Sequence, residues 1–463
     1  MLNAIFLSLL AAATANADWN RFRGPDGSGV AETGKLPTEF SDRKNLRWRT
    51  ELPPGHSSPI VSNGKIFLTA FEKDELFTIC VEAKTGKVLW RVAAPRTRKD
   101  EVDKRNSPAS PSPAVDRDTV YVFFQDFGLL AYDLKGKEKW RMPLGPFINV
   151  YGMGASPVIS GDMVVLVCDQ SHDSFIAAFD RKTGQQRWRT KRPEALSGHS
   201  TVLVRDGLIY APASFRMDVY QAATGESVWH VKGLASEMKS VPVIYKDHIY
   251  ISGYNTPEND PGKQVKIPDF EDTLAKFDKN GDKKISIEES PDAATKKYFP
   301  YIDLNKDGLM DAEEWKMYAA TMSAENGLLA VKLGGHGDVT ATGVTWKFHR
   351  SIPQLPSTLV YRDELYMIND SGVLTTLDPA TGKVHKQARL RGVSESFYSS
   401  PVASDGKVFF LSRPGVLTVV EAGPEQKVLS FFELNEEAVA TPAINSGRIF
   451  VRTKAALYCY GLQ

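Results

Sequence analysis

Ser58-Pro59-Ile60 begins a sequence motif that occurs eight times along the chain: a small polar residue, a proline, then an alternating apolar strand. The other copies are Ser112-Pro113-Ala114, Ser156-Pro157-Val158, Ser240-Val241-Pro242, Ser400-Pro401-Val402, Thr441-Pro442-Ala443 and, without the proline, Ser200-Thr201-Val202 and Ser357-Thr358-Leu359. A recurring unit that cannot bury its own apolar face must stack on copies of itself. The repeat therefore indicates the architecture before any single residue is interpreted.

The second half of each unit is a strand, a tight turn and another strand that ends in tryptophan. Residues 81–90 read VEAKTGKVLW, and similar segments end in Trp140, Trp188 and Trp229. Glycine supplies the positive φ of the turn, and the indole offers a large flat surface to a neighbouring sheet. The spacing of about forty to fifty residues is typical of a four-stranded propeller blade.

The two ends of the chain predict how the ring closes. The segment after Thr441 supplies three strands but no tryptophan strand, whereas Leu46-Arg47-Trp48-Arg49 is a tryptophan strand with nothing before it. Pairing Trp48 with the Tyr458 segment completes a blade and hides two sheet edges. The prediction is an all-β, eight-bladed β-propeller closed by N- and C-terminal strands, with a small α-helical insertion. A β-sandwich or an open array of strands explains the long period less well.

Composition and the N-terminus predict an exported protein. The net charge is +1 and no basic run is present, so nothing indicates nucleic acid or an anionic membrane. Residues 1–17 combine an apolar core with Ala15-Asn16-Ala17 and predict a signal peptide cut before Asp18, hence a periplasmic or secreted location. We expect no transmembrane segment and, because no cysteine follows the cut, no lipid anchor.

The three cysteines, Cys80, Cys168 and Cys459, fall in predicted strands of different blades. Strands of different blades rarely bring two Cα atoms within bridging distance, so we expect buried, unpaired thiols.

One repeat is interrupted by a segment with helical rather than alternating patterning. The expected organisation is a tail at 18–44, propeller at 45–254, an insertion at 255–326 and propeller again at 327–463. The insertion holds two twelve-residue loops that resemble the EF-hand pattern, in which oxygen ligands surround Ca²⁺. The predicted metal ligands are Asp278, Asn280, Asp282, Lys284 (backbone) and Glu289 in the first loop, and Asp303, Asn305, Asp307, Leu309 (backbone), Asp311 and Glu314 in the second.

The two loops differ at their sixth position. Gly308 stands there in the second loop, and Lys283 in the first. A non-glycine residue at positive φ costs about 1–2 kcal/mol, and the extra cation opposes Ca²⁺, so we expect the first site to be weaker. Ile285 and Met310, both at position eight, are expected to pair as a short β-bridge. A solvated acidic turn is the alternative for one loop, but two in tandem with helical flanks favour a calcium-binding pair.

The insertion lies between the second and third strands of its blade. That connection shares a face with the segments that precede each inner strand, so we expect it to border the mouth of the central channel. The predicted ligand-binding residues at this mouth are His56, Arg105, Asn106, Tyr151, His199, Glu237, Lys239, Gln354, Glu395 and Tyr398, and Glu437 belongs to the same rim. Ordinary solvated loop residues are the alternative for any one of them.

Three features resemble a known family: the segment from Trp19 to Gly27, the tandem loops, and Gly334 to Thr340 before Trp346. With the Gly–Trp blades, they resemble exported propellers of the pyrroloquinoline quinone (PQQ) type, common in planctomycetes and their relatives. That family includes quinoprotein dehydrogenases and BamB-like assembly scaffolds. The quinoprotein enzymes hold PQQ against a disulfide of adjacent cysteines, beside Ca²⁺ and a catalytic Asp. This chain has no adjacent cysteines, and we can assign neither quinone ligands nor a catalytic residue.

The function expected from these observations is a non-catalytic binding or scaffold protein that binds Ca²⁺ and a protein or glycan partner. One alternative is a quinoprotein-like oxidoreductase with its ligand in the channel mouth. The other is a carbohydrate-binding or carbohydrate-active propeller that uses Glu237, Glu395 and Glu437.

Overall fold

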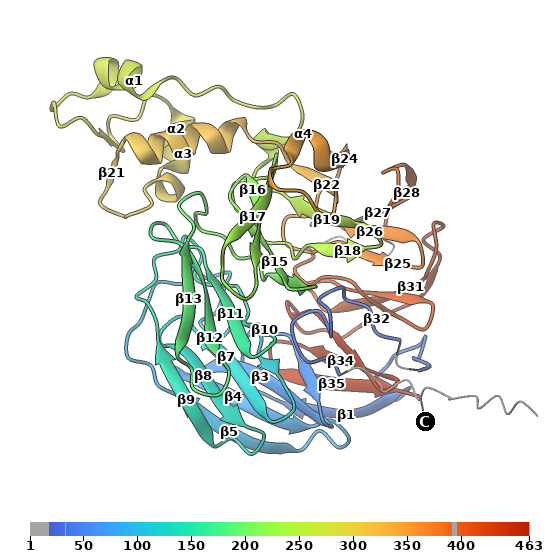
Figure 1. Cartoon of the computed structure of the whole chain (residues 1–463). Helices are drawn as coiled ribbons and strands as arrows, with labels where there is room; N and C mark the ends of the chain where they lie inside the picture. Colours follow the sequence, from blue (N-terminus) through green and yellow to red (C-terminus); the bar gives the residue numbers. More distant parts are fainter. Residues whose placement is uncertain (1–17, 33, 391–395, 463) are drawn as a thin grey trace, which may run out of the picture.

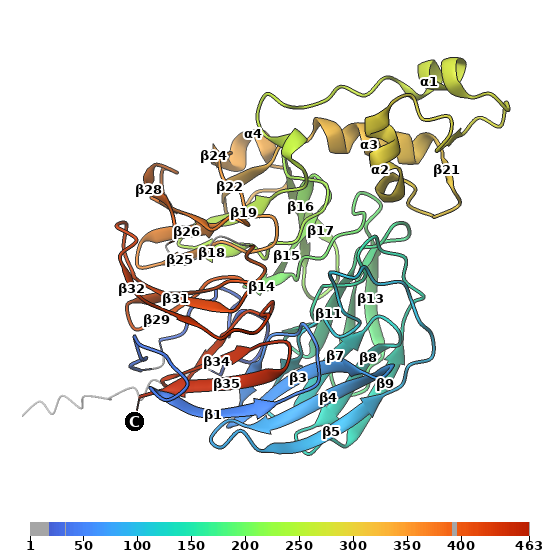
Figure 2. The same cartoon turned by 180° about the vertical axis from the view of Figure 1, so that it is seen from behind.

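The computed structural model describes residues 18–32, 34–390 and 396–462, which form a ring of four-stranded sheets with a helical unit on one side (Figure 1). Figure 2 shows the same ring from behind, with the helical unit projecting beyond β13 and β16. Eight sheets make up the ring, so the predicted eight-bladed, all-β propeller is confirmed. The predicted signal peptide, residues 1–17, and the rim residue Glu395 lie outside the described residues.

Seven blades follow one another along the chain, each ordered from the channel outward. Blades 1 to 4 are β2 (Ile60–Ser62), β3 (Lys65–Glu72), β4 (Glu75–Glu82), β5 (Val88–Ala94); β6 (Ala114–Val115), β7 (Thr119–Phe124), β8 (Gly128–Asp133), β9 (Glu138–Pro143); β10 (Val158–Ser160), β11 (Met163–Cys168), β12 (Phe175–Asp180), β13 (Gln186–Lys191); and β14 (Leu203–Arg205), β15 (Leu208–Ala213), β16 (Arg216–Gln221), β17 (Ser227–Lys232). Blades 5 to 7 are β18 (Val243–Tyr245), β19 (His248–Gly253), β22 (Gly327–Lys332), β24 (Val344–Phe348); β25 (Leu359–Tyr361), β26 (Glu364–Ile368), β27 (Val373–Leu377), β28 (Val384–Arg389); and β29 (Val402–Ser404), β30 (Lys407–Leu411), β31 (Val416–Glu421), β32 (Val428–Glu433).

Blade 8 joins the two ends of the chain. Its inner strands are β33 (Ala443–Asn445), β34 (Arg448–Arg452) and β35 (Ala456–Gly461), and its outer strand is β1 (Leu46–Glu51). Trp48 pairs with Cys459 and Arg49 with Tyr458 in an antiparallel register. The predicted closure is confirmed, and pairing removes both free edges that an open ring would expose.

The recurrent tryptophan and glycine meet at the seam between blades. The Trp48 indole donates its Nε1–H to the Ala83 carbonyl, 3.1 Å away, and lies against Gly86 in the turn of blade 1. Gly86 has φ 78°, and a Cβ placed there would come within 2.6 Å of the Trp48 ring. The same contact recurs between Trp90 and Gly136, Trp140 and Gly184, Trp188 and Gly225, and Trp346 and Gly382. Glycine is required both for the backbone conformation and for the close approach.

The seam after blade 4 is built differently. Blade 5 replaces the tight turn with a longer loop, in which β23 (Gly337–Asp338) runs parallel to β17 and α4 (Thr340–Gly343) follows. Asp338 accepts hydrogen bonds from the Thr340 backbone and hydroxyl and lies 2.9 Å from the Lys232 ammonium. The glycine-rich segment around His336 therefore covers the outer edge of blade 4.

The inserted segment joins β19 to β22, the second and third strands of blade 5, as expected. It contains η1 (Pro257–Asn259), α1 (Phe270–Phe277), β20 (Ile285–Ser286), α2 (Ala293–Ile302), β21 (Leu309–Met310) and α3 (Ala312–Ser323). The predicted β-bridge between Ile285 and Met310 is present. Both side chains are fully buried, in a small core of their own with Trp315 and Phe299. The insertion therefore has its own apolar centre.

The tail that precedes β1 crosses one end of the channel, which we call the base; the opposite end, where the insertion lies, is the mouth. Trp19 bridges to Val61 in blade 1, and Val30 bridges to Ala403 in blade 7. Arg23 is fully buried and donates to the Thr358 carbonyl of blade 6 at 2.7 Å. The sequence predicted a tail here, but not that it closes the channel.

The three cysteines are buried and form no disulfide, as predicted. They belong to β4, β11 and β35, in three different blades.

Candidate functional site

The polar residue of the repeat explains the inner wall of the channel. The backbone N–H of Ser58 donates to the Ser112 hydroxyl at 2.9 Å, and the Ser112 N–H donates to the Ser156 hydroxyl at 2.9 Å. The same bond continues from Ser156 to Thr201, Val241 to Ser357, Ser357 to Ser400, Ser400 to Thr441, and Thr441 to Ser58. We call these seven side chains the hydroxyl ring. Each hydroxyl ties its blade to the preceding one.

The ring has one gap. Blade 5 presents Val241 at the equivalent position, so no ring hydroxyl accepts the Thr201 N–H. Instead, the Ser200 hydroxyl donates to the Ser240 carbonyl at 2.6 Å. The seam between blades 4 and 5 is thus held by a substitute bond.

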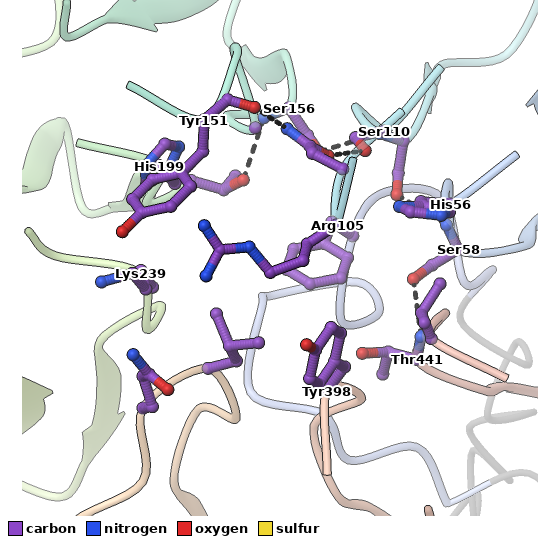
Figure 3. Close-up of a pocket in the computed structure, with 18 residues that line it drawn as sticks. His56, Ser58, Arg105, Ser110, Tyr151, Ser156, His199, Lys239, Tyr398 and Thr441 are labelled. Carbon is purple, nitrogen blue, oxygen red and sulfur yellow. Dashed lines mark hydrogen bonds between the residues drawn. The ribbon is translucent and has the colours of Figure 1, made fainter. Parts of the chain in front are cut away.

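Above the ring, the mouth opens into a cavity of about 260 Å³, which we call the cup. Phe22 of the tail contributes to its lining from the base, and Tyr151, His199 and Tyr398 stand around its walls (Figure 3). The other lining residues are His56, Ser58, Arg105, Asn106, Ser110, Ser112, Gly154, Ser156, Thr201, Lys239, Gln354, Leu355, Val439 and Thr441.

The structure brings most of the predicted rim residues together in the cup: His56, Arg105, Asn106, Tyr151, His199, Lys239, Gln354 and Tyr398. Two predicted carboxylates lie elsewhere. Glu237 lines a separate cavity of about 270 Å³ beneath the inserted helices, and Glu437 lines a third cavity with Arg413. In both cases an ion pair sets the direction of the carboxylate, because Glu237 binds Lys239 and Glu437 binds Arg413.

Several lining residues escaped the sequence interpretation. Phe22 belongs to a tail without repeat patterning, so nothing local indicated its place. Ser58, Ser112, Ser156, Thr201 and Thr441 were recognised as repeat residues but not as cup residues. Their shared position, immediately before each inner strand, is the signal that could have identified them.

Two cations face the cup, each oriented by a carboxylate behind it. The Arg105 guanidinium holds Asp103 through two hydrogen bonds, 2.7 Å from Nε to Oδ1 and 2.9 Å from Nη2 to Oδ2. It also lies 4.9 Å from the centre of the Tyr151 ring. The side chain of Lys239 is only 8 % exposed, and its Nζ lies 3.1 Å from Glu237 Oε2. Neither Asp103 nor Glu237 lines the cup, and no other Asp or Glu of the described residues does.

Both histidines of the cup are neutral imidazoles at neutral pH. Burial, reinforced by the nearby Lys239 ammonium, lowers the pKa of His199 to about 3. Burial and the Arg452 guanidinium lower the pKa of His56 to about 4. His199 packs edge-on against Tyr151, with ring centres 5.5 Å apart, and its Nε2 is buried without a hydrogen-bond partner. In the described part of the chain, neither imidazole is hydrogen-bonded to a hydroxyl or a carboxylate.

One half-buried carboxyl lies behind the cup. Asp370 accepts a hydrogen bond from the Gln354 backbone at 3.2 Å. Burial raises the pKa of Asp370 to about 6, with Lys239 acting in the opposite direction. It supports the loop that carries Gln354.

The twelve-residue loops of the insertion fold around their own backbone. In the second loop, Asp303 accepts from the N–H of Gly308 at 2.9 Å, and Glu314 accepts from the N–H of Leu304 at 2.8 Å and of Asp311 at 3.1 Å. The first loop repeats this pattern with Asp278 and Glu289. Among the described residues, no three His, Cys, Asp or Glu side chains converge as a metal cluster.

Backbone strain does not separate the two loops as expected. Lys283 does have positive φ, 62°, but Lys306 in the second loop has φ 61°. The first loop places glycine at position four and lysine at six, and the second loop reverses them. Each loop therefore carries one strained lysine, and the difference between them is one of charge: the Lys284 ammonium of the first loop lies 3.0 Å from Asp307 of the second.

The insertion contacts the rim directly. The Tyr301 ring of α2 lies 6.3 Å from that of Tyr151, which lines the cup, and Lys306 forms an ion pair with Glu101. The twelve-residue loops and the cup are thus neighbours at one mouth.

No helix in the described ranges is long and apolar enough to cross a membrane.

Comparison with known proteins relates the whole ring to one family. The family described as "Outer membrane protein assembly factor BamB", built on the PQQ-type repeat, matches residues 38–150, 80–257 and 316–462. A curated relative, the outer membrane protein assembly factor BamB of Francisella salina, is 25 % identical over 155 residues. That match covers 32 % of this chain and only 28 % of the relative.

Solved structures agree on the fold. BamB from Moraxella catarrhalis superposes with a TM-score of 0.57 at 12 % identity, over 90 % of this chain and 99 % of that one. The quinohemoprotein alcohol dehydrogenase of Comamonas testosteroni superposes with a TM-score of 0.59 at 11 % identity, over 96 % of this chain and 80 % of that one. Because the repeat pattern matches well over half of the sequence, this chain belongs to the BamB-type, PQQ-repeat family of β-propellers.

Proposed function

We propose that this protein is an exported, non-catalytic binding or scaffold propeller that holds a ligand in the cup and binds calcium in its inserted loops. The observation that carries the proposal is the cup: a cavity backed by the tail at its base, open at the mouth, and lined by polar side chains from many blades. Ligand sites are concave and combine apolar walls with a few convergent polar groups. The relatives named as assembly factors support a protein partner.

Export rests on the N-terminal sequence. Asp18, the residue that would follow the cut, accepts a hydrogen bond from the Ser62 hydroxyl at 2.7 Å. A new N-terminus at this position would therefore be held at the base of the propeller. Mass spectrometry of the protein recovered from a periplasmic or culture fraction should give a chain that begins at Asp18.

The cup is tested with variants that leave the ring intact. A panel of sugars, sugar acids and short peptides is screened for compounds that raise the melting temperature of the mature protein. The effect of a cup ligand should be lost in Tyr398→Ala and retained in Phe431→Ala, because Phe431 is 53 % exposed on the outer strand β32. Stabilising compounds that act equally on both variants would show that the ligand binds elsewhere.

Assays on the same protein distinguish the proposed function from the oxidoreductase and carbohydrate-active alternatives. The oxidoreductase alternative requires dye reduction with alcohols or sugars after addition of PQQ and Ca²⁺, and we expect none. The carbohydrate-active alternative needs carboxylates that work together, but Glu237 and Glu437 line different cavities. A glycan array would detect carbohydrate binding without catalysis.

Calcium binding is supported by the chemistry of the two loops. Each offers only oxygen donors: carboxylates, an Asn amide and a backbone carbonyl, the set that a hard cation prefers. The pairing of Ile285 with Met310 couples the loops. The feature that opposes calcium binding is Lys284. Its ammonium donates a hydrogen bond to the Asp307 carboxylate and must be displaced before that carboxylate can bind the ion.

Two matched variants test the calcium pair. At a calcium concentration of a hundred times the dissociation constant, binding to the folded state adds about 2.7 kcal/mol. Glu314→Gln should abolish calcium binding to the second loop in calorimetry, whereas Glu289→Gln should act mainly on the first. Two unchanged titrations would contradict the assignment of both loops.

A further inference from the structure

The hydroxyl ring has spare donor capacity on the side of the cup. Ser58, Ser112, Ser156, Thr201 and Thr441, from five successive blades, all line the cup. Each of these hydroxyls accepts a backbone N–H from the neighbouring blade. No acceptor for their own protons is found among the described residues. A hydroxyl is one donor and two acceptor lone pairs. One lone pair of each hydroxyl is therefore used in holding the ring, and its proton remains available to donate to a ligand.

The remaining polar groups of the cup are also mainly donors. Figure 3 shows the Arg105 guanidinium pointing into the space between Tyr151, His199 and Lys239. Asp103 occupies Nε and one N–H of Nη2, so three guanidinium N–H groups are left. Lys239 makes two hydrogen bonds to Glu237 and keeps one N–H. The Nε2 atom of His199 is buried without a hydrogen-bond partner, and in a neutral imidazole this atom donates in one tautomer and accepts in the other.

We propose that the cup binds a small organic oxyanion, whose charged group lies between Arg105 and Lys239 and whose other oxygens accept from the hydroxyl ring. This inference rests on the proposed function of the cup as a ligand site and adds the chemistry of the ligand. A carboxylate, a sulfate ester and a phosphate ester share the acceptor-only oxygens that such a set of donors selects. Planar carboxylates and tetrahedral esters also match the fork of an arginine.

The shape of the cup limits the ligand. A volume of about 260 Å³ lies below the range of roughly 300–1,000 Å³ typical of sites for drug-sized molecules, so a single substituted ring fits. The rings of Tyr151 and Tyr398 offer flat walls to it. Because the tail crosses the base, a polymer can enter only by its end.

Matched ligand pairs provide the test. Calorimetry and thermal shift of the mature protein compare glucuronate, glucose 6-sulfate and glucose 6-phosphate with glucose, and benzoate with benzyl alcohol. The anions should bind and raise the melting temperature, and the neutral partners should not. The three sugar anions distinguish carboxylate, sulfate and phosphate as the preferred group.

Two variant pairs locate the effect. Arg105→Gln should weaken binding of the preferred anion at least tenfold, whereas Arg413→Gln, a rim cation that lines the neighbouring cavity, should change it less than twofold. Ser112→Ala and Ser400→Ala each remove one ring bond, but only Ser112 lines the cup. Of these two variants, only Ser112→Ala should weaken binding of the anion.

The outcomes separate this inference from the proposed function. Neutral partners that bind as well as the anions, with binding still lost in Tyr398→Ala, would overturn the oxyanion and leave the cup as a ligand site. Anion binding that is equal in Arg105→Gln and Arg413→Gln would also overturn it. Compounds that bind without any dependence on cup residues would reject both.

Discussion

The two ends of the central channel are finished in opposite ways. At the base, the tail fills the opening with fully buried Trp19 and Arg23, whose contacts reach blades 1 and 6. At the mouth, the same blades leave a cavity lined by two cations, two neutral imidazoles and a row of hydroxyls. The repeat alone makes an open ring. A segment outside the repeat crosses one end of it, and the cup opens at the other end.

From this contrast we expect the base to carry stability and, under the proposed function, the mouth to carry binding. Residues of the base are buried and their loss should unfold the ring, whereas residues of the mouth should be replaceable at little cost in stability. Three pairs of variants test this division, in descending order of expected effect.

The largest effect is expected at the base. Trp19→Ala removes a fully buried indole that bridges to blade 1, and large-to-small changes of buried aromatic residues cost about 3–5 kcal/mol. Tyr398→Ala at the mouth should cost about 1 kcal/mol or less, because its ring is half-buried in an open cavity. Urea denaturation of the two variants measures both values. Equal losses would mean that the tail merely covers a ring that is stable without it.

An intermediate effect is expected in the hydroxyl ring, which lies between the two ends. Ser400→Ala leaves the buried N–H of Ser357 without its acceptor, at a cost of about 1–3 kcal/mol. Val241→Thr, which supplies the missing hydroxyl opposite Thr201, should instead stabilise by about 0.5–1 kcal/mol. Thermal melts of both variants give the sign. A destabilised Val241→Thr would show that the substitute bond between Ser200 and Ser240 already completes the seam.

The smallest effect on stability is expected on lowering the pH, through the protonation of His199. The pKa of His199 is about 3 in the folded protein and about 6.5 in the unfolded chain. As pH falls below 6.5, the unfolded chain binds the proton first, so stability is lost progressively towards pH 3. His199→Gln should therefore lose about 0.8 kcal/mol less than the native protein between pH 7.5 and 6, in urea titrations.

Asp370 provides the control of opposite sign. Its pKa is raised to about 6, so its protonation in the folded state adds stability as pH falls through 6. Asp370→Asn should make the loss between pH 7.5 and 5 larger. Parallel pH profiles for the native protein and both variants would contradict the burial of these groups.

The fold could be predicted because its determinants repeat. Trp48 and Gly86 meet across a seam, and the same two residue types meet at four other seams, so one local pattern describes most of the ring. The unpaired Trp48 strand likewise predicted its partner in the Tyr458 segment, where Trp48 pairs with Cys459. Repetition converts a long-range contact into a pattern that can be read along the chain.

The closure of the base could not be predicted in this way. Arg23 finds its partner at Thr358, more than three hundred residues away, and no periodicity links them. The predicted direction of two rim carboxylates was wrong for a related reason. Glu237 and Glu437 lie at the rim, as predicted. An ion pair of Glu237 with Lys239, and another of Glu437 with Arg413, direct these carboxylates into cavities other than the cup. Side-chain direction depended on partners that the sequence does not place together.

The two ends of the insertion are tied to each other before they leave the blade. Asn326, fully buried, accepts from the Asn255 N–H at 3.0 Å and donates its own N–H to the Asn259 carbonyl at 2.8 Å, directly beyond the paired Gly253 and Gly327. The hairpin of blade 5 is therefore complete without the seventy residues it carries. An unrelated domain with closely spaced termini could be grafted between positions 255 and 326. The same propeller would then carry different inserted domains without a change in its own fold.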